Sequence, residues 1–483
     1  MKGLPRAGLF LFDTAARCRY RNRTMSITCK QDQAERLGAA VRFRTVSITA
    51  ENPRSDPRYA EFAAFLAFLR KEFPRASSSL GWEQLGDLAL LLTWSPPVAA
   101  NDPALLFYGH FDVVPAGDEA AWARPPFGGE VADGFIWGRG TLDDKNIVMA
   151  LMETVESLLS SSFTPARTLY LAFGGDEEAT GRHGAQVIAR TLAERGVRLA
   201  CVFDEGSIIS DGIISFIKKP LAMIGLAEKG FANIEVTVTG APGHSSMPGR
   251  GTAAGALSRA VAAIEKSRFA PRLTPVVARF FAAIAPHAQG GIGIALRLLK
   301  PLWFLLRGAL TADSSVDALL RTTQAVTILR SGEVPNVIPG DARAIVNVRL
   351  LPGDTTAGVR ARLEKIARRA VARPFSLEVG FAPHATLNEP VSSARLDPAL
   401  WKAVADSVLL VEPGAIIAPF LVLGATDSRQ FVAVADAIVR FMPTVLTSKD
   451  VARLHGVDER ISLDNYGRMI AYYASVMRIM AGV

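Results

Sequence analysis

The chain alternates between two hydrophobic patterns, and this alternation predicts its fold class. Over residues 59–73 the apolar positions recur at helical spacing, and the pattern stops at Pro74. Further along, short apolar runs typical of buried strands take turns with helical patterns. The strand-like runs are 104–108, 168–173 and 199–203, and the helical patterns are 146–159 and 185–195. This order predicts an α/β fold with a mostly parallel sheet and helices on both faces.

The pattern changes at about residue 231. Residues 232–239 and 344–350 alternate apolar and polar side chains, which is typical of strands with one buried face. With helical patterns between them, they predict a small α+β domain inserted into the first one. Three parts are therefore expected: an N-terminal extension over 1–24, a main domain formed by 25–230 and 382–483, and an inserted lid or dimerisation domain over 231–381.

One apolar segment, residues 291–310, has some of the character of a membrane helix. Arg297, Lys300, Pro301 and Arg307 interrupt it, so we expect a lid helix that packs on its neighbours instead of one that crosses a bilayer. Two alternatives remain open. The segment could form an apolar wall for a greasy substrate, or it could touch a membrane surface with its basic residues at the interface.

Charge and cysteine content narrow the possible functions. The formal net charge is +8, but the basic residues are spread along the chain and form no dense basic stripe, so no nucleic-acid partner is expected. Cys18, Cys29 and Cys201 have no CxxC spacing, which argues against a disulfide framework and a thiolate zinc site. Since the sequence has no clear signal peptide or transmembrane segment, a cytoplasmic location is expected.

Residue types that bind divalent metals follow the predicted strands. His110, Glu178 and Asp204 each come shortly after one of the three strand-like runs. Because the carboxyl ends of parallel strands meet at one edge of a sheet, these side chains are expected to lie close together. Zinc prefers imidazole and carboxylate ligands, and a two-metal site needs one carboxylate that bridges both ions. Asp143, before a predicted helix, and His455, near the C-terminus, complete such a set.

Two neighbouring residues suit supporting roles at such a centre. Asp112 lies two positions after His110, where its carboxylate could accept a hydrogen bond from the far ring nitrogen and fix the tautomer. Glu177 precedes Glu178, and adjacent glutamates can divide the work. One binds metal while the other accepts a proton from a water molecule.

In this order, the segments resemble the aminoacylase and carboxypeptidase S family of co-catalytic zinc peptidases. The matching stretches are GHFDVVP (109–115), WGRGTLDDK (137–145), GGDEEATG (174–181), FDEGS (203–207), GAPGHSSMP (240–248), NVIPG (336–340), GATDSRQF (424–431) and HGVDERIS (455–462). They cover nearly the whole chain beyond residue 35. The run before NVIPG and the HGVDERIS tail look most like the Gly-X carboxypeptidase branch.

The resemblance implies two Zn²⁺ ions per protomer. Asp143 would bridge them, with His110 and Asp204 completing one ion and Glu178 and His455 the other. Either of two adjacent acids could be the last ligand of the first ion. We favour Asp204, and Glu205 is the alternative. Glu177 would be the general base for the bridging water, and Asp112 would support His110.

The resemblance also implies how a substrate is held. His244 would reach across a homodimer, formed through the inserted domain, to stabilise the oxyanion. Asn336 and Arg349 would hold the substrate's carbonyl and carboxylate, and the fork-shaped guanidinium gives Arg349 a physical basis for this role. Thr426, Asp427 and Arg429 would line the same pocket.

The implied activity is zinc-dependent hydrolysis of an amide bond next to a free amino-acid carboxylate. A carboxypeptidase or dipeptidase that releases a C-terminal amino acid is the favoured reading. The alternative is an N-acyl, or N-fatty-acyl, amino acid hydrolase or synthase. A non-catalytic binding protein on the same fold is a remote third hypothesis, because such a protein would normally have lost a ligand or the base.

Overall fold

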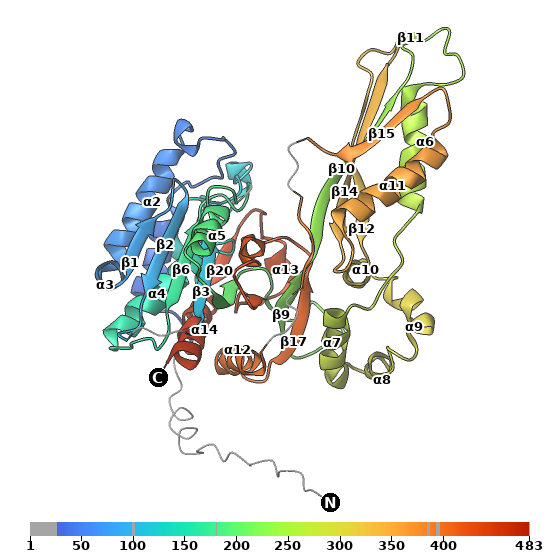
Figure 1. Cartoon of the computed structure of the whole chain (residues 1–483). Coiled ribbons are helices and arrows are strands. Elements are labelled where there is room, and N and C mark those ends of the chain that lie inside the picture. The colour runs from blue at the N-terminus through green and yellow to red at the C-terminus, as the bar shows by residue number, and fades with distance from the viewer. Residues whose placement is uncertain (1–26, 99–101, 180, 384–386, 393–396, 483) are drawn as a thin grey trace, which may run out of the picture.

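The computed structural model describes residues 27–98, 102–179, 181–383, 387–392 and 397–482. A large α/β region and an elongated second region stand side by side and are joined near the middle of the molecule (Figure 1). The predicted extension over 1–24 lies outside the described residues.

The large region is built on a sheet of eleven strands. Its path runs through β1 (Gly81–Gln84), β2 (Ala89–Trp94), β6 (Leu169–Gly174), β3 (Ala104–His110), β7 (Leu199–Asp204), β18 (Ile438–Arg440), β9 (Leu221–Glu228), β8 (Ile209–Ser210) and β19 (Val445–Leu446). Two further strands, β16 (Val391–Ser392) and β17 (Ile416–Val422), pair with β9. The central strands β6, β3, β7 and β18 are parallel, and antiparallel pairs lie toward the edges.

Helices cover both faces of this sheet, as predicted. Leu105 and Phe107 of β3 pack into one apolar cluster, and Leu106 and Tyr108 pack into another on the opposite face. The first cluster includes residues of α1 (Gln31–Val41), α2 (Tyr59–Glu72), α3 (Pro74–Ser79), α4 (Lys145–Ser160), α12 (Pro398–Val411) and α14 (Leu463–Ala481). The second includes α5 (Ala185–Glu194) and the short helix η5 (Asp427–Phe431).

The second region is a four-stranded antiparallel sheet, as the alternating pattern predicted. Its order is β12 (Thr323–Ser331), β14 (Asp341–Leu350), β10 (Gly230–Thr239) and β15 (Ser376–Phe381). One face is apolar and packs under α6 (Ala253–Lys266) and α11 (Thr356–Ala370). At its far tip β11 (Gly243–His244) pairs with β13 (Val337–Ile338). We refer to this sheet and its two helices as the lid.

Residues 275–320, which lie within the predicted insertion, do not join the lid core. They form α7 (Pro275–Ile284), α8 (Ile292–Arg297), α9 (Trp303–Leu310) and α10 (Ser314–Leu320). These helices share an apolar cluster with β9 and β17 of the main sheet, where the Phe280 and Phe420 ring centroids are 5.5 Å apart. The apolar segment 291–310 is thus two short helices, and no helix among the described residues is long and apolar enough to cross a membrane.

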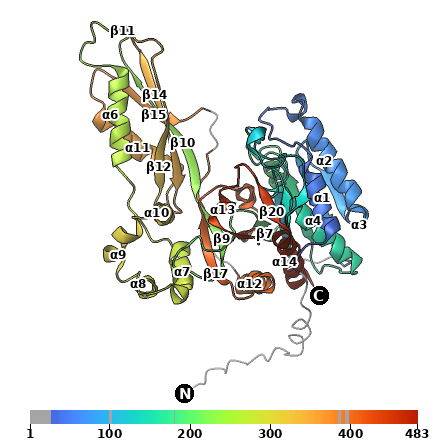
Figure 2. The ribbon, with the colours of Figure 1, turned by 180° about the vertical axis from the view of Figure 1, so that it is seen from behind.

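A small third sheet and one short helix bring the C-terminal part of the chain to the main sheet. β20 (Arg460–Ser462) pairs with β5 (Phe135–Trp137), which pairs with β4 (Val131–Ala132). Helix α13 (Ser448–Val451) comes shortly before β20. Seen from behind, α13 and β20 lie between the main sheet and the lid (Figure 2). This arrangement carries the loop with His455 to the site described next.

Candidate active site

Loops at one edge of the main sheet bring the predicted metal-binding side chains together. His110 is the last residue of β3, Glu178 follows β6, and Glu205 follows β7. These three strands are parallel neighbours, so their carboxyl ends open on the same edge. Asp143 arrives from the turn before α4, and His455 from the loop after α13.

Two groups of potential metal ligands overlap at Asp143. One group is His110, Asp143 and Glu205, and the other is Asp143, Glu178 and His455. The Nε2 atoms of His110 and His455 each lie 3.0 Å from a different carboxylate oxygen of Asp143. His455 Nε2 is also 3.1 Å from Glu178 Oε1. A carboxylate with one oxygen toward each group has the geometry that a bridging ligand needs.

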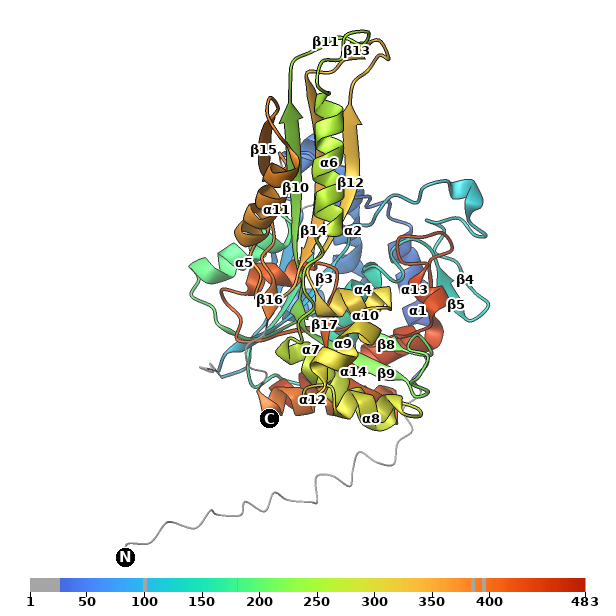
Figure 3. The same cartoon turned by 90° about the vertical axis from the view of Figure 1, so that its right-hand side faces the viewer.

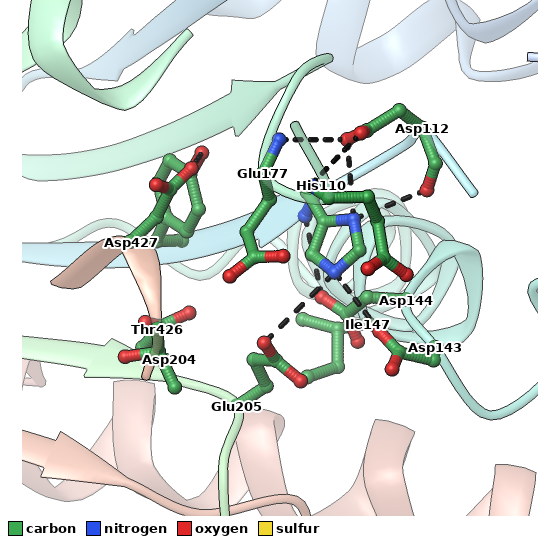
Figure 4. A network of polar contacts seen from close by, with 12 residues as sticks. His110, Asp112, Asp143, Asp144, Ile147, Glu177, Asp204, Glu205, Thr426 and Asp427 are labelled. Carbon is green, nitrogen blue, oxygen red and sulfur yellow. Dashed lines mark hydrogen bonds and ion pairs between the residues drawn. The ribbon is translucent and has the colours of Figure 1, made fainter. Parts of the chain in front are cut away.

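The geometry replaces Asp204 by Glu205 in this ligand set. Glu205 Oε1 lies 3.9 Å from His110 Nε2, whereas no ligand group among the described residues includes Asp204. Figure 4 shows the Glu205 carboxylate beside the His110 ring and Asp204 next to Thr426. The preference for Asp204 therefore does not agree with the structure, and the alternative does.

Side-chain alternation along β7 explains this difference. Val202 faces the cluster with α5 and η5, and Phe203 faces the cluster with α4. Asp204 therefore turns to the Val202 side, where its Oδ2 accepts a hydrogen bond of 2.9 Å from the backbone N–H of Ser428. Glu205 turns to the other side, toward Asp143. Burial raises the pKa of Asp204, and the hydrogen bond from Ser428 opposes that rise.

Asp112 supports three functional groups at once. Its Oδ1 is 3.3 Å from His110 Nδ1, on the ring edge opposite the ligand group. Its two carboxylate oxygens accept hydrogen bonds of 3.1 Å from the backbone N–H groups of Glu177 and Glu178. The predicted supporting role of Asp112 thus has a wider structural basis than its spacing from His110 indicated, because it also fixes the loop that carries the base.

Glu177 lies in the cleft between the ligand groups and Asp427. Its carboxyl is enclosed, and this burial raises its pKa well above the ordinary value while the nearby His110 lowers it. The neighbouring carboxyls of Asp427 and Glu178 raise it further. Glu177 lies beside both ligand groups and belongs to neither, which leaves its carboxylate available as a general base.

Arg139 and Glu459, which sequence reasoning did not single out, connect two ligand loops. Glu459 is fully buried, forms an ion pair with Arg139, and accepts hydrogen bonds from the N–H groups of Gly140 (2.9 Å) and Leu142 (2.7 Å). Arg139 donates to the carbonyl of His455 at 3.2 Å. The pair therefore fixes the loop before Asp143 against the loop of His455. Both residues lie inside segments that resemble the family, and this position was the only feature of the sequence that could have pointed to them.

The residues present suit divalent cations. Among the described residues, the cleft gathers the carboxylates of Asp143, Glu177, Glu178 and Glu205 with two imidazoles. Burial opposes ionisation of Asp143, but hydrogen bonds from His110 and His455 hold its pKa below the ordinary value. Enclosed carboxylates at these separations repel one another unless cations lie between them. Imidazole and carboxylate together are zinc-type ligands.

A cleft of about 680 Å³ extends from this centre to the lid. Besides the ligand groups and Glu177, the polar residues that line it are Arg349, Asn388, Thr426, Asp427, Arg429 and Gln430. Its apolar walls are formed by Phe231, Phe420, Val422 and Leu423. This volume is in the range of small-molecule sites and fits a dipeptide or an acylated amino acid.

Arg349 and Arg429 place two guanidinium groups on the same cleft. Arg349 lies over the Phe231 ring, with its Cζ 4.6 Å from the ring centroid. Arg429 donates from Nε to the Thr426 carbonyl at 2.6 Å, and its Nη2 lies 3.6 Å from Glu228 Oε1. Burial lowers the pKa of Arg349, and the charge of Arg429 lowers it further. Two neighbouring cations of this kind are suited to an anionic substrate group.

Thr426 and Asp427 line the cleft, as predicted, but both are held by protein groups. Tyr108 donates its hydroxyl proton to Asp427 Oδ2 at 2.6 Å, and burial raises the pKa of Asp427 to about 7. Thr426 Oγ1 donates to Glu228 Oε2 at 3.1 Å. A Cβ added at Gly181 would approach Asp427 Oδ1 to 2.2 Å, so a glycine is required there for this packing.

His244 and Asn336 lie at the far tip of the lid and do not line the cleft of their own chain. Both are exposed, and the backbone N–H of Ser245 donates to the Asn336 carbonyl at 3.1 Å. Figures 1 and 3 both show the tip far from the catalytic loops. Extended β14 rises about 3.3 Å per residue, so Asp341 at its start and Arg349 near its end lie about 26 Å apart. Asn336 and Arg349 of one chain are therefore too far apart to hold the same substrate, and their joint role stays a prediction that needs a second copy.

Comparison with protein families identifies one match. The model of the peptidase family M20/M25/M40 matches residues 106–479. An N-fatty-acyl-amino acid synthase/hydrolase, PM20D1.1 of Danio rerio, is 36% identical over 449 residues, which are 91% of this chain and 84% of that protein. A probable carboxypeptidase S-like 2 protein of Dictyostelium discoideum is 33% identical, over 92% of this chain and 84% of its own.

Solved structures share the fold. An M20 family metallo-carboxypeptidase, Sso-CP2 of Sulfolobus solfataricus, superposes with a TM-score of 0.68 at 18% identity, over 93% of this chain and 99% of that one. The YXEP protein of Bacillus subtilis, described as a dinuclear metal-binding peptidase, has a TM-score of 0.55 at 12% identity, over 94% of this chain and 99% of that one. The resemblance inferred from the sequence segments is confirmed.

Proposed function

We propose, since the chain belongs to the peptidase family M20/M25/M40 and is a metallo-hydrolase, that it cleaves an amide bond next to a free amino-acid carboxylate. It would act as a carboxypeptidase or dipeptidase that releases a C-terminal amino acid. The observation that carries this proposal is the placement of Arg349 and Arg429 on the same cleft as Glu177 and both ligand groups. A carboxylate bound by these arginines would present its neighbouring amide to the ligand groups.

We assign two zinc ions to this cleft. His110, Asp143 and Glu205 would hold one ion, and Asp143, Glu178 and His455 the other, with Asp143 shared between them. When bound, the two ions lower the pKa of a water molecule and polarise the substrate's carbonyl oxygen. The mixed imidazole and carboxylate set is the support for zinc over magnesium or calcium, which favour ligands that are all oxygen.

Glu177 carries the proton transfers in this account. It accepts a proton from the attacking water as the C–O bond forms, and it returns that proton to the leaving nitrogen as the C–N bond breaks. Asp112 holds the Glu177 backbone in place through the 3.1 Å hydrogen bond. Arg349 keeps the released amino acid's carboxylate oriented. Because each step is reversible, the same groups would also join a carboxylate to an amino acid.

A second candidate substrate class has its own support in the cleft. Phe231, Phe420, Val422 and Leu423 form an apolar wall, which suits an acyl chain as the other half of the amide. The relative from Danio rerio is named an N-fatty-acyl-amino acid synthase/hydrolase. The chain would then hydrolyse or form N-acyl amino acids with the same chemistry at the same site.

We also propose a homodimer that uses the lid. His244 and Asn336 are polar, exposed and remote from their own cleft, so the cleft they could serve belongs to a second copy. There His244 would stabilise the developing oxyanion.

The edge of the lid sheet is a suitable dimer surface. β12 is an edge strand of the lid sheet and exposes Ile328 and Leu329, with Val334 and Val337 beside them. An unpaired apolar edge of this kind is suited to pairing with another chain.

A substrate panel tests the proposal and separates its two forms. Zinc-loaded enzyme would be assayed with a dipeptide, a short-chain N-acyl amino acid and a long-chain N-acyl amino acid, each with a free or an amidated carboxylate. Hydrolysis of the free-carboxylate members, lost on amidation, is expected. A preference for the dipeptide supports the carboxypeptidase or dipeptidase activity. A preference for the long-chain N-acyl amino acid supports the N-acyl amino acid hydrolase or synthase activity. Equal turnover of amidated and free substrates would contradict both.

A further inference from the structure

Helices α8 and α9 present apolar side chains to solvent on the outer surface of the molecule. Figure 3 shows the two helices on the side that faces the viewer, below the lid. The side chain of Phe304 is 77% exposed and that of Leu305 is 78% exposed. Ile292, Ile294 and Leu298 are exposed beside them along the segment. We call these five residues the α8–α9 patch.

The segment that carries the patch is anchored from below. Leu296 and Leu299 are buried in the cluster shared with α7 and β17, and Trp303 and Leu306 pack against the same cluster. The two helices are therefore apolar on both the inward and the outward side. A surface helix of a globular protein normally turns charged or polar residues outward, so the outward apolar side is not explained by the needs of the fold.

The charged residues of the segment that carries the patch are all basic. Arg297, Lys300 and Arg307 are exposed within the same segment, and residues 288–312 contain no aspartate or glutamate. Arg307 Cζ lies 5.1 Å from the centroid of the Phe304 ring, so charge and apolar surface are interleaved. Exposed aromatic and aliphatic groups beside arginine and lysine are the combination that binds an anionic lipid surface.

We propose that the α8–α9 patch docks on an anionic lipid surface. Phe304 and Leu305 would enter the boundary between headgroups and acyl chains, while Arg297, Lys300 and Arg307 pair with lipid phosphates. The same charges argue against a second copy of this chain as the occupant, because two such patches would repel each other. Docking here would also bring the cleft near the lipid, since Phe280 of α7 packs on Phe420 of the cleft wall.

Co-sedimentation of the full chain with lipid vesicles tests the proposal. Vesicles of phosphatidylcholine with one-third phosphatidylglycerol are compared with vesicles of phosphatidylcholine alone, at low and high salt. We expect binding to the anionic vesicles that weakens at high salt, as electrostatic attraction to a charged surface requires. Absence of binding, or equal binding to both kinds of vesicle, would overturn the proposal.

Two sets of variants locate the binding surface. Phe304→Ser with Leu305→Ser should lower the partition coefficient about ten-fold or more, because two large apolar groups no longer insert. The matched control is Leu409→Ser with Leu410→Ser, a pair of leucines on α12 that are 41% and 38% exposed. The control should bind as the unchanged chain does. Equal loss in both pairs, or none in the first, would place the contact elsewhere.

A charge series separates the patch from general basicity. Replacing Arg297, Lys300 and Arg307 by glutamine should abolish the preference for anionic vesicles. Lys71, Lys365 and Arg369 are exposed elsewhere on the molecule. Replacing these three by glutamine changes the net charge by the same amount and should preserve the preference for anionic vesicles. Both triple variants keep the basic segment 1–24. A difference in vesicle binding between them therefore cannot come from that segment. If the first variant keeps its preference, or if the second variant loses it equally, the patch is not the lipid contact.

Discussion

The cleft and the lid tip hold predicted functional residues in opposite environments. In the cleft, His110 is fully buried and is held between Asp112 and Asp143. At the tip, His244 is exposed, and its ring Nδ1 lies 2.8 Å from Ser246 Oγ within the same turn. The first arrangement is organised before any substrate arrives. The second is positioned by its strand and is not among the residues that line the active-site cleft, so the role proposed for it requires the cleft of a second copy.

The largest expected effect concerns the base in the cleft. Glu177→Gln should lower kcat by about 10³- to 10⁴-fold, because the amide can neither accept nor return the proton. Metal content, measured by elemental analysis, should stay at the value of the unchanged enzyme, since Glu177 lies outside both ligand groups. Turnover within ten-fold of the unchanged enzyme would remove Glu177 from the mechanism.

The choice between the two acids at the end of β7 is tested by a pair of variants. Glu205→Ala should release one metal ion and lower kcat by about 10²-fold or more, because a ligand of His110's group is lost. Asp204→Asn keeps an oxygen that can accept the Ser428 N–H, so it should retain both ions. Elemental analysis and kcat are measured together. Metal loss in Asp204→Asn with none in Glu205→Ala would reverse the assignment.

Arg349 should affect substrate binding more than the chemical step. Arg349→Met should raise KM by about 10- to 100-fold for substrates with a free carboxylate, because a charge-assisted pair is lost. Arg343→Met changes the same strand near its other end, where Arg343 pairs with Asp341, and should leave KM unchanged. If both variants raise KM equally, the effect comes from the strand and not from the carboxylate.

Glu459 should affect metal affinity and little else. Glu459→Gln should weaken metal binding by about 10- to 100-fold, because the loops of Asp143 and His455 lose their shared support. At saturating zinc, kcat should recover. Glu153→Gln breaks another enclosed pair, with Arg36, away from the cleft, and should lower the melting temperature without a change in metal affinity. A chelator titration that gives the same metal affinity for both variants would remove the positioning role of Glu459.

Much of the cleft could be predicted because local sequence determines it. The apolar runs located β3, β6 and β7, and parallel pairing then placed His110, Glu178 and the acids after β7 on one edge. Between the two adjacent acids, the sequence favoured Asp204, whereas the ligand group contains Glu205. Strand alternation does decide it, because Asp204 and Glu205 must face opposite sides of the sheet.

The lid shows what the sequence pattern left out. Asn336 and Arg349 are thirteen positions apart, and the resemblance paired them, but an extended strand between them keeps them far apart. The placement of α7–α10 against β17 also depends on contacts between distant parts of the chain, which no local pattern reports. The ion pair of Arg139 with Glu459 joins residues 320 positions apart, so no local pattern predicts it either.

The most direct test of the account joins the two regions in one measurement. A His244→Ala chain and a Glu177→Gln chain are co-expressed with different tags, and the mixed dimer is compared with each homodimer. One cleft of the mixed dimer has an intact base and the partner's intact tip. If His244 of one protomer serves the cleft of its partner, random pairing of equal amounts recovers about a quarter of the unchanged activity, since half the dimers are mixed and one of their two sites is complete. Activity no greater than that of the two homodimers combined would contradict it.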